Sequence, residues 1–159
     1  ELAAGFDITR FGAAPTKFDE NDLLPLTARH LHGLPYQSVR DTIAGIGVPD
    51  ELAERFWEVT RENITTLHDL EAWWAMFRDG ARPEIDDEDR DFVAEALALL
   101  PERPYDGDTW GQWTSAVKEA TGRKGRALFM PLRKALTGQS HGPDMAQMLP
   151  LMQRIRAKE

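Results

Sequence analysis

The chain has 159 residues, enough for one good-sized domain or two small domains that share a core, and 42% of them are hydrophobic. It contains no Cys, which excludes disulfides and Cys-based zinc sites and indicates a cytoplasmic protein. The net charge is −8, yet residues 1–116 hold 10 Lys/Arg and 24 Asp/Glu, whereas residues 117–159 hold 9 and 3. Two interpretations stay open: a C-terminal surface that binds phosphate, or an asymmetry that affects only solubility.

From this sequence we expect neither a signal peptide nor a membrane span. No apolar run approaches the roughly 18 residues of a membrane span, so we expect no membrane partner. Residues 1–4 lack the basic and apolar regions of a signal peptide. They also lack an initiating Met, which indicates a piece of a longer protein.

Helical spacing of apolar residues recurs along the chain, and no segment alternates convincingly with the period of two that marks a strand. After an irregular opening over residues 6–18, the pattern predicts four helices. They run over about residues 22–32 after a cap at Asp19 or Asn21, from Pro35 to about Gly45, from Pro49 onward, and from a cap at Thr65 or Thr66 to Gly80. Of the adjacent Trp73 and Trp74 in the fourth helix, only one can face the core.

Four further helices are predicted after an acidic run at residues 84–91. The first three of them stop at Pro101, at Gly122 and at Gly138, and the last begins at Pro143. The seventh helix is marked by the apolar residues Leu128, Phe129, Leu132 and Leu136. The predicted fold is therefore all-α, with about eight helices of 10–16 residues in two small sub-bundles. These cover residues 1–100 and 101–159 and are divided at a Pro/Gly-rich stretch near 101–108.

No constellation of catalytic residues is visible. His30 and His32 would point to different faces of a helix, and no nucleophile elbow or glycine-rich phosphate loop occurs. The acidic run lacks the Gly-centred spacing of a calcium loop, and carboxylates in a first helical turn complement the helix dipole. We therefore predict no catalytic residue, no metal site and no cofactor in this chain; a metal-dependent enzyme built on the acidic run is the least favoured alternative.

The richest segment is residues 121–143, with the sequence TGRKGRALFMPLRKALTGQSHGP. Arg123, Lys124 and Arg126 crowd a helix N-terminus, where cations oppose the helix dipole, so an anionic partner would account for them. Pro131 should kink the helix, and the planar guanidinium of Arg133 can stack on a base. A kinked core helix that follows a solvated basic turn explains the same residues equally well.

Residues 121–145 closely resemble the C-terminal signature of bacterial glutamyl-tRNA synthetases. That signature has a Gly-Lys/Arg-Gly-Lys/Arg turn, a Phe-x-Pro-Leu-Arg helix and an Ala-Leu-Thr-Gly loop that ends in Gly-Pro. Weaker matches at residues 14–31 and 63–67 extend the resemblance along the chain, with loose similarity between about 70 and 108.

The resemblance implies the α-helical anticodon-binding region of such an enzyme without its catalytic domain. Motifs like His-Ile-Gly-His and Lys-Met-Ser-Lys-Ser, which mark that domain, do not occur in this sequence. The parent enzyme would attach L-glutamate to tRNA(Glu), with ATP and Mg bound in the missing domain, and this chain alone would be inactive. Its expected partner is the tRNA(Glu) anticodon stem-loop, not DNA, and it is expected to be a monomer.

The resemblance also implies roles for individual residues. Arg133 matches an Arg that stacks on the first anticodon base, Pro143 matches a Pro on the other side of that base, and Met145 matches an apolar contact. The predicted RNA-binding residues are Arg123, Lys124, Arg126, Arg133, Gln139, Ser140, His141, Gly142, Pro143 and Met145. The alternative is a helical protein-interaction domain, in which an exposed apolar patch near Trp73 and Trp74 binds another protein.

Overall fold

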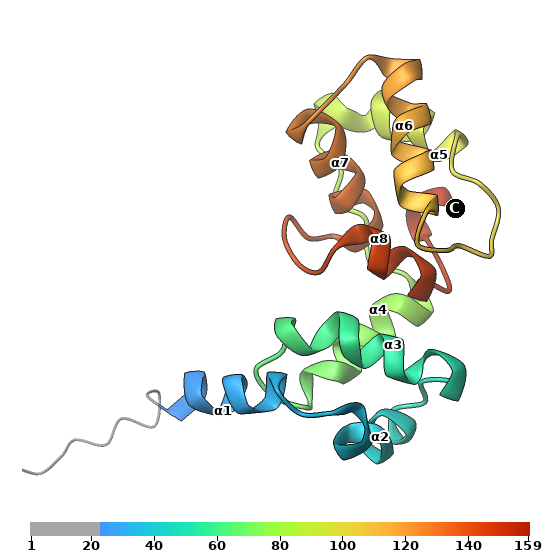
Figure 1. The fold of residues 1–159 in the computed structure, drawn as a ribbon. Coiled ribbons are helices and arrows are strands. Elements are labelled where there is room, and N and C mark those ends of the chain that lie inside the picture. Colours follow the sequence, from blue (N-terminus) through green and yellow to red (C-terminus); the bar gives the residue numbers. More distant parts are fainter. Residues whose placement is uncertain (1–22) are drawn as a thin grey trace, which may run out of the picture.

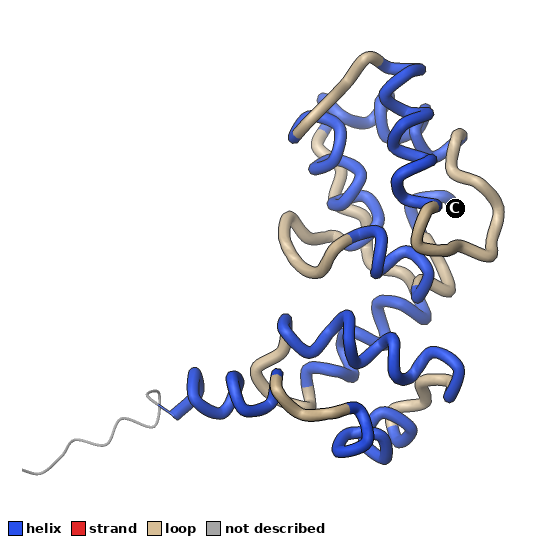
Figure 2. Tube along the Cα trace, viewed as in Figure 1, coloured by secondary structure: helices blue, strands red, loops and turns tan. Residues whose placement is uncertain are grey.

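The computed structural model describes residues 23–159, and this part of the chain forms eight α-helices and no strand (Figures 1 and 2). The helices are α1 Leu23–His32, α2 Tyr36–Gly45, α3 Asp50–Thr60, α4 Asp69–Asp79, α5 Arg90–Ala98, α6 Thr109–Thr121, α7 Arg126–Thr137 and α8 Met145–Met148. The all-α class is confirmed. The predicted opening over residues 6–18 and the caps at Asp19 or Asn21 lie outside the described residues.

Proline and glycine set most of the helix boundaries. Pro35 and Pro49 stand immediately before α2 and α3. Gly80, Gly122 and Gly138 follow α4, α6 and α7 with φ values of 75°, 71° and 65°. Glycine reaches this region without the steric cost that a Cβ imposes, so these helices end where the sequence predicts. The eighth helix is shorter than predicted, because after Met148 the chain tightens into the 3-10 turn Leu149–Leu151.

The start of α4 corrects the predicted cap. No threonine side chain caps this helix; instead, the Asp69 carboxylate accepts hydrogen bonds from the backbone N–H groups of Thr66 (2.9 Å) and Thr65 (2.8 Å). These bonds lower the pKa of Asp69, because they favour its charged form. The carboxylate therefore stabilises the turn at neutral pH, and this contribution is lost as the pH falls through the lowered pKa.

One continuous cluster of buried side chains joins the helices. Phe56 of α3 lies edge-to-face against Trp74 and Phe77 of α4, with ring centroids 5.9 and 6.0 Å away. Trp113 of α6 donates its Nε1–H to the carbonyl of Ala96 in α5 over 2.7 Å. The aromatic side chains thus fix how α3 packs on α4 and how α6 packs on α5.

Phe129 is an exception among the apolar residues that mark α7. The helical pattern includes it with Leu128, Leu132 and Leu136, but its side chain is 45% exposed in the structure. Leu128 and Leu132, four residues apart, occupy the buried face, and Phe129 lies one residue further around the helix. Its ring lies beside that of Trp110, with centroids 6.3 Å apart.

The helices form two groups in the view of Figure 1, with α1–α4 in the lower half and α5–α8 in the upper half. Helix α5 packs on α6 and α7, although the predicted boundary at residue 100 assigns it to the first sub-bundle. That boundary stays a prediction. The stretch 101–108 is held by the C-terminal segment, where Arg103 donates to the Oε1 of Gln153 over 3.0 Å. No helix in the described range combines the length and apolar character that crossing a bilayer requires.

Candidate nucleic-acid interface

The basic turn before α7 contains two kinds of cation. Arg123 forms an ion pair with Asp89 over 2.5 Å, and its side chain is only 31% exposed. Lys124 and Arg126 are exposed and form no ion pair with another described residue. The charge of Arg123 is therefore already neutralised, whereas Lys124 and Arg126 keep charges that an anionic ligand can reach.

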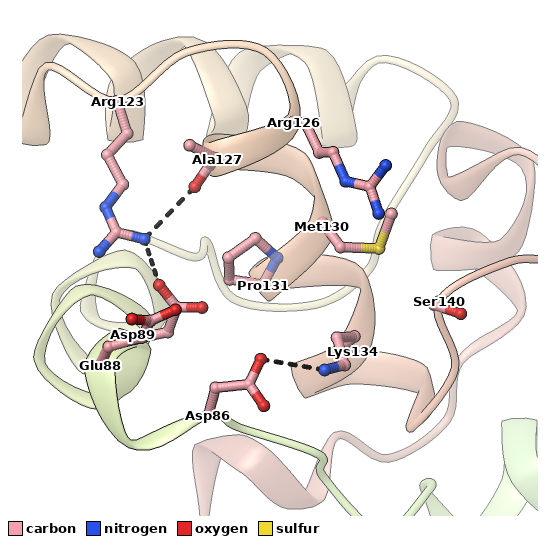
Figure 3. A pocket seen from close by; sticks show the side chains of 10 residues that line it. All are labelled: Asp86, Glu88, Asp89, Arg123, Arg126, Ala127, Met130, Pro131, Lys134 and Ser140. Atoms are coloured by element: carbon pink, nitrogen blue, oxygen red, sulfur yellow. Dashed lines mark hydrogen bonds and ion pairs between the residues drawn. The ribbon is translucent and has the colours of Figure 1, made fainter.

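The acidic run neutralises a second cation, Lys134 on α7. Its Nζ lies 2.9 Å from a carboxylate oxygen of Glu84 and 3.0 Å from one of Asp86, and these bonds raise the pKa of Lys134. These residues line a groove of about 680 Å³. Figure 3 shows Asp86 facing Lys134 of α7, and Asp89 facing Arg123 in the turn before α7. Across residues 23–159, no group of three or more His, Asp or Glu side chains is arranged to hold a metal ion. The acidic run at residues 84–91 instead forms ion pairs with Arg123 and Lys134 of the same chain.

Arg133 joins α7 to the loop that follows it. Its Nη2 donates to the carbonyl of Pro143 and, more weakly, to that of Gly142 over 3.5 Å. Its Nη1 is buried and has no hydrogen-bond partner among the described residues. Burial lowers the pKa of Arg133, and the charge of Asp144 opposes that effect. Arg133 is thus a half-buried cation that holds the loop and keeps one donor unused.

The loop itself is anchored at both ends. The Thr137 hydroxyl donates to the carbonyl of Arg133 (2.8 Å) and accepts from the backbone N–H of Gln139 (3.1 Å). At the far end, the Asp144 carboxylate caps α8 by accepting from the N–H of Ala146 over 2.9 Å. Between these anchors the predicted residues Gln139, Ser140 and His141 are exposed, while Pro143 is buried. Met145, the first residue of α8, is also buried. The loop therefore presents three polar side chains on a fixed base.

A second groove, of about 510 Å³, lies between α4 and this loop. It is lined by Asn63, Asp69, Ala72, Trp73, Met76, Gln139, His141 and Gly142. Trp73 is half-buried and Trp74 is 4% exposed, which confirms that only one of the two faces the core. A Cβ built on Gly142 would lie 3.2 Å from Nη1 of Arg133 and 3.6 Å from the Trp73 ring, so both side chains flank this glycine.

This arrangement brings together residues that are distant in sequence. An aromatic ring, a guanidinium and several amide and hydroxyl groups beside an exposed loop are what single-stranded bases require for stacking and edge recognition. Trp73 is not among the residues predicted from the sequence to bind RNA. Its doublet with Trp74 signalled one ring outside the core, but nothing local placed that ring near Gly142.

Known proteins resemble the chain over nearly its full length. The family model described as "Anticodon binding domain" matches residues 34–158. Glutamate–tRNA ligase 1 of Roseobacter denitrificans is 67% identical over 99% of this chain and 36% of its own length. The proteins of the same name in Ruegeria pomeroyi and Cereibacter sphaeroides are 66% and 63% identical over the same shares. The chain thus spans 36% of the length of these relatives, and it belongs to the anticodon-binding domain family.

Proposed function

We propose that this chain recognises the anticodon stem-loop of tRNA(Glu) as the anticodon-binding part of a glutamate–tRNA ligase. The whole protein would attach L-glutamate to that tRNA, with ATP and Mg bound in the part that this chain does not include. One observation carries the RNA-binding proposal: the Trp73 ring and the unused Nη1 donor of Arg133 flank Gly142 beside an exposed polar loop. The protein would act as a monomer in the cytoplasm.

The proposed contacts divide into stacking, edge recognition and phosphate binding. Arg133 and Trp73 supply planar surfaces for splayed bases, since every base has a face that can stack. Gln139, Ser140, His141 and the backbone at Gly142 supply donors and acceptors for base edges. The buried Pro143 and Met145 hold the loop from the core side, while the exposed Lys124 and Arg126 meet phosphates.

The proposal is tested by titrating the chain with the tRNA(Glu) anticodon stem-loop at a stated low salt concentration and following tryptophan fluorescence. The control is the same stem-loop with a scrambled anticodon, because phosphate contacts alone bind both RNAs equally. Tighter binding to the native anticodon supports the proposal. Equal binding to both RNAs, or none, contradicts it for this chain and favours the alternative of a helical protein-interaction domain.

Trp73 and Trp74 provide a matched pair of variants. We expect Trp73→Leu to weaken binding of the native stem-loop roughly 5- to 100-fold, the loss of about one stacked base, with little change in melting temperature. Trp74→Leu should mainly lower the melting temperature, because that side chain is 4% exposed and its removal leaves a cavity. Differential scanning fluorimetry and the same titration measure both effects. Unchanged RNA affinity in Trp73→Leu would show that the groove beside α4 does not hold a base.

A further inference from the structure

We infer that Arg123 is a positioning residue rather than a phosphate ligand: it supplies the hydrogen-bond donor that Pro131 removes from α7. In this way it fixes the helix that carries Arg133. The hydrogen bond from Arg123 to α7 is a feature of the fold and does not depend on RNA. Its consequence for RNA rests on the proposed function.

Pro131 creates an unpaired acceptor inside α7. A residue at this position would normally donate its backbone N–H to the carbonyl four residues earlier, that of Ala127, but proline has no N–H. Pro131 is buried, and α7 continues through it as one helix. In the structure the Nη1 of Arg123 donates to the Ala127 carbonyl over 3.3 Å (Figure 3). A side chain from the preceding turn thus replaces the missing backbone donor.

Contacts with α5 fix the guanidinium in that place. The same Nη1 lies 2.5 Å from a carboxylate oxygen of Asp89, just before α5. The guanidinium carbon lies 4.1 Å from the ring centroid of Phe92, in the first turn of that helix, within cation–π range. Arg123 therefore links the start of α5 to the first turn of α7, and Asp89 already neutralises its charge.

The neighbouring cations have no such partners. Arg126 is exposed and, within the described part of the chain, has no ion pair, so it can release a counterion when it meets a phosphate. Arg123 should not, because its charge is paired before RNA arrives. Arg126 should thus strengthen RNA binding by meeting a phosphate directly, whereas Arg123, three residues earlier, should act only by positioning α7.

A double-mutant cycle tests the link to Pro131 without RNA. Arg123→Met keeps a long side chain over Phe92 but removes the donors, and it should lower the melting temperature by roughly 3–8 °C. In a Pro131→Ala background the same change should cost measurably less, because residue 131 then donates its own N–H to Ala127. Arg126→Ala is the control and should leave the melting temperature unchanged. Additive effects of Arg123→Met and Pro131→Ala would overturn the inference.

The salt dependence of stem-loop binding tests whether Arg123 is a phosphate ligand. Arg126→Ala should reduce the slope of log Kobs against log salt by roughly 0.7–0.9, the release of one counterion. Arg123→Met should lower the affinity but leave this slope unchanged. An equal loss of slope in both variants would make Arg123 a phosphate ligand and overturn the inference. If the unmodified chain binds no stem-loop, the proposed function fails, while the melting temperatures still decide the role of Arg123.

Discussion

Replacing Gly138 with alanine should lower the melting temperature by roughly 6–12 °C, which corresponds to about 3 kcal/mol in a domain of this size. Two costs combine. Gly138 ends α7 with φ 65°, a conformation that costs an L side chain about 1–2 kcal/mol. In addition, a Cβ at this position would lie 2.6 Å from the backbone carbonyl oxygen of Arg82, so the backbone must shift. Thermal unfolding followed by circular dichroism measures the effect.

Gly122→Ala is the matched control. Gly122 ends α6 with φ 71° in the same kind of left-handed cap, but a Cβ there would meet no atom within 4 Å. We expect a loss of only about 1–2 kcal/mol, the conformational cost alone. The difference between the two variants isolates the close approach of the Arg82 backbone. Equal losses in the two variants would show that the contact between the added Cβ and the Arg82 carbonyl costs no stability.

The close packing of the Arg82 backbone against Gly138 is important because it fixes the point at which the candidate RNA-binding loop leaves α7. The segment between α4 and α5 crosses the end of α7, where the N–H of Glu84 donates to the carbonyl of Lys134 over 3.1 Å. The loop that begins at Gly138 therefore leaves α7 from a point held by backbone contacts as well as by the Lys134 ion pairs. A defect at Gly138 should misplace the residues at 139–142 as well as lower stability.

The local features of this fold could be predicted from the sequence, because their causes lie within a few residues. Proline before α2 and α3 and glycine after α4, α6 and α7 act on their own φ angles and hydrogen bonds. Helical spacing was strong enough to give the all-α class. Phe129 is exposed because its neighbour Leu128 takes the core position. At the start of α4, the carboxylate of Asp69, three to four residues after the predicted threonine caps, holds the turn.

The site could be predicted only in part, because its geometry depends on contacts between distant residues. Arg123 is a basic residue beside a helix in the sequence, but Asp89, 34 residues away, neutralises it. Lys134 meets Asp86 across 48 residues. Likewise, only the folded chain brings Trp73 next to Gly142. The charge pattern therefore indicated a basic surface but overestimated how many of its cations are available.

Replacing Arg133 with alanine should weaken binding of the native anticodon stem-loop roughly 5- to 100-fold, or about 1–3 kcal/mol. The variant loses the planar surface and the unused Nη1 donor, and it releases the carbonyls of Gly142 and Pro143 that Nη2 holds. The loop then lacks the guanidinium beside Gly142 and one of its anchors. A fluorescence titration against the scrambled stem-loop shows whether the loss is specific for the anticodon.

Arg133→Lys separates stacking from charge. Lysine keeps the positive charge and can reach one carbonyl, but it has no planar fork to stack on a base or to donate in two directions. If stacking dominates, the lysine variant should bind almost as weakly as the alanine variant; if charge dominates, it should regain most of the affinity. The melting temperature should fall by only a few degrees in either variant, since part of the Arg133 side chain faces solvent. A large fall in melting temperature with unchanged anticodon preference would instead make Arg133 a purely structural residue, and base recognition would then depend on Trp73 and the polar loop alone.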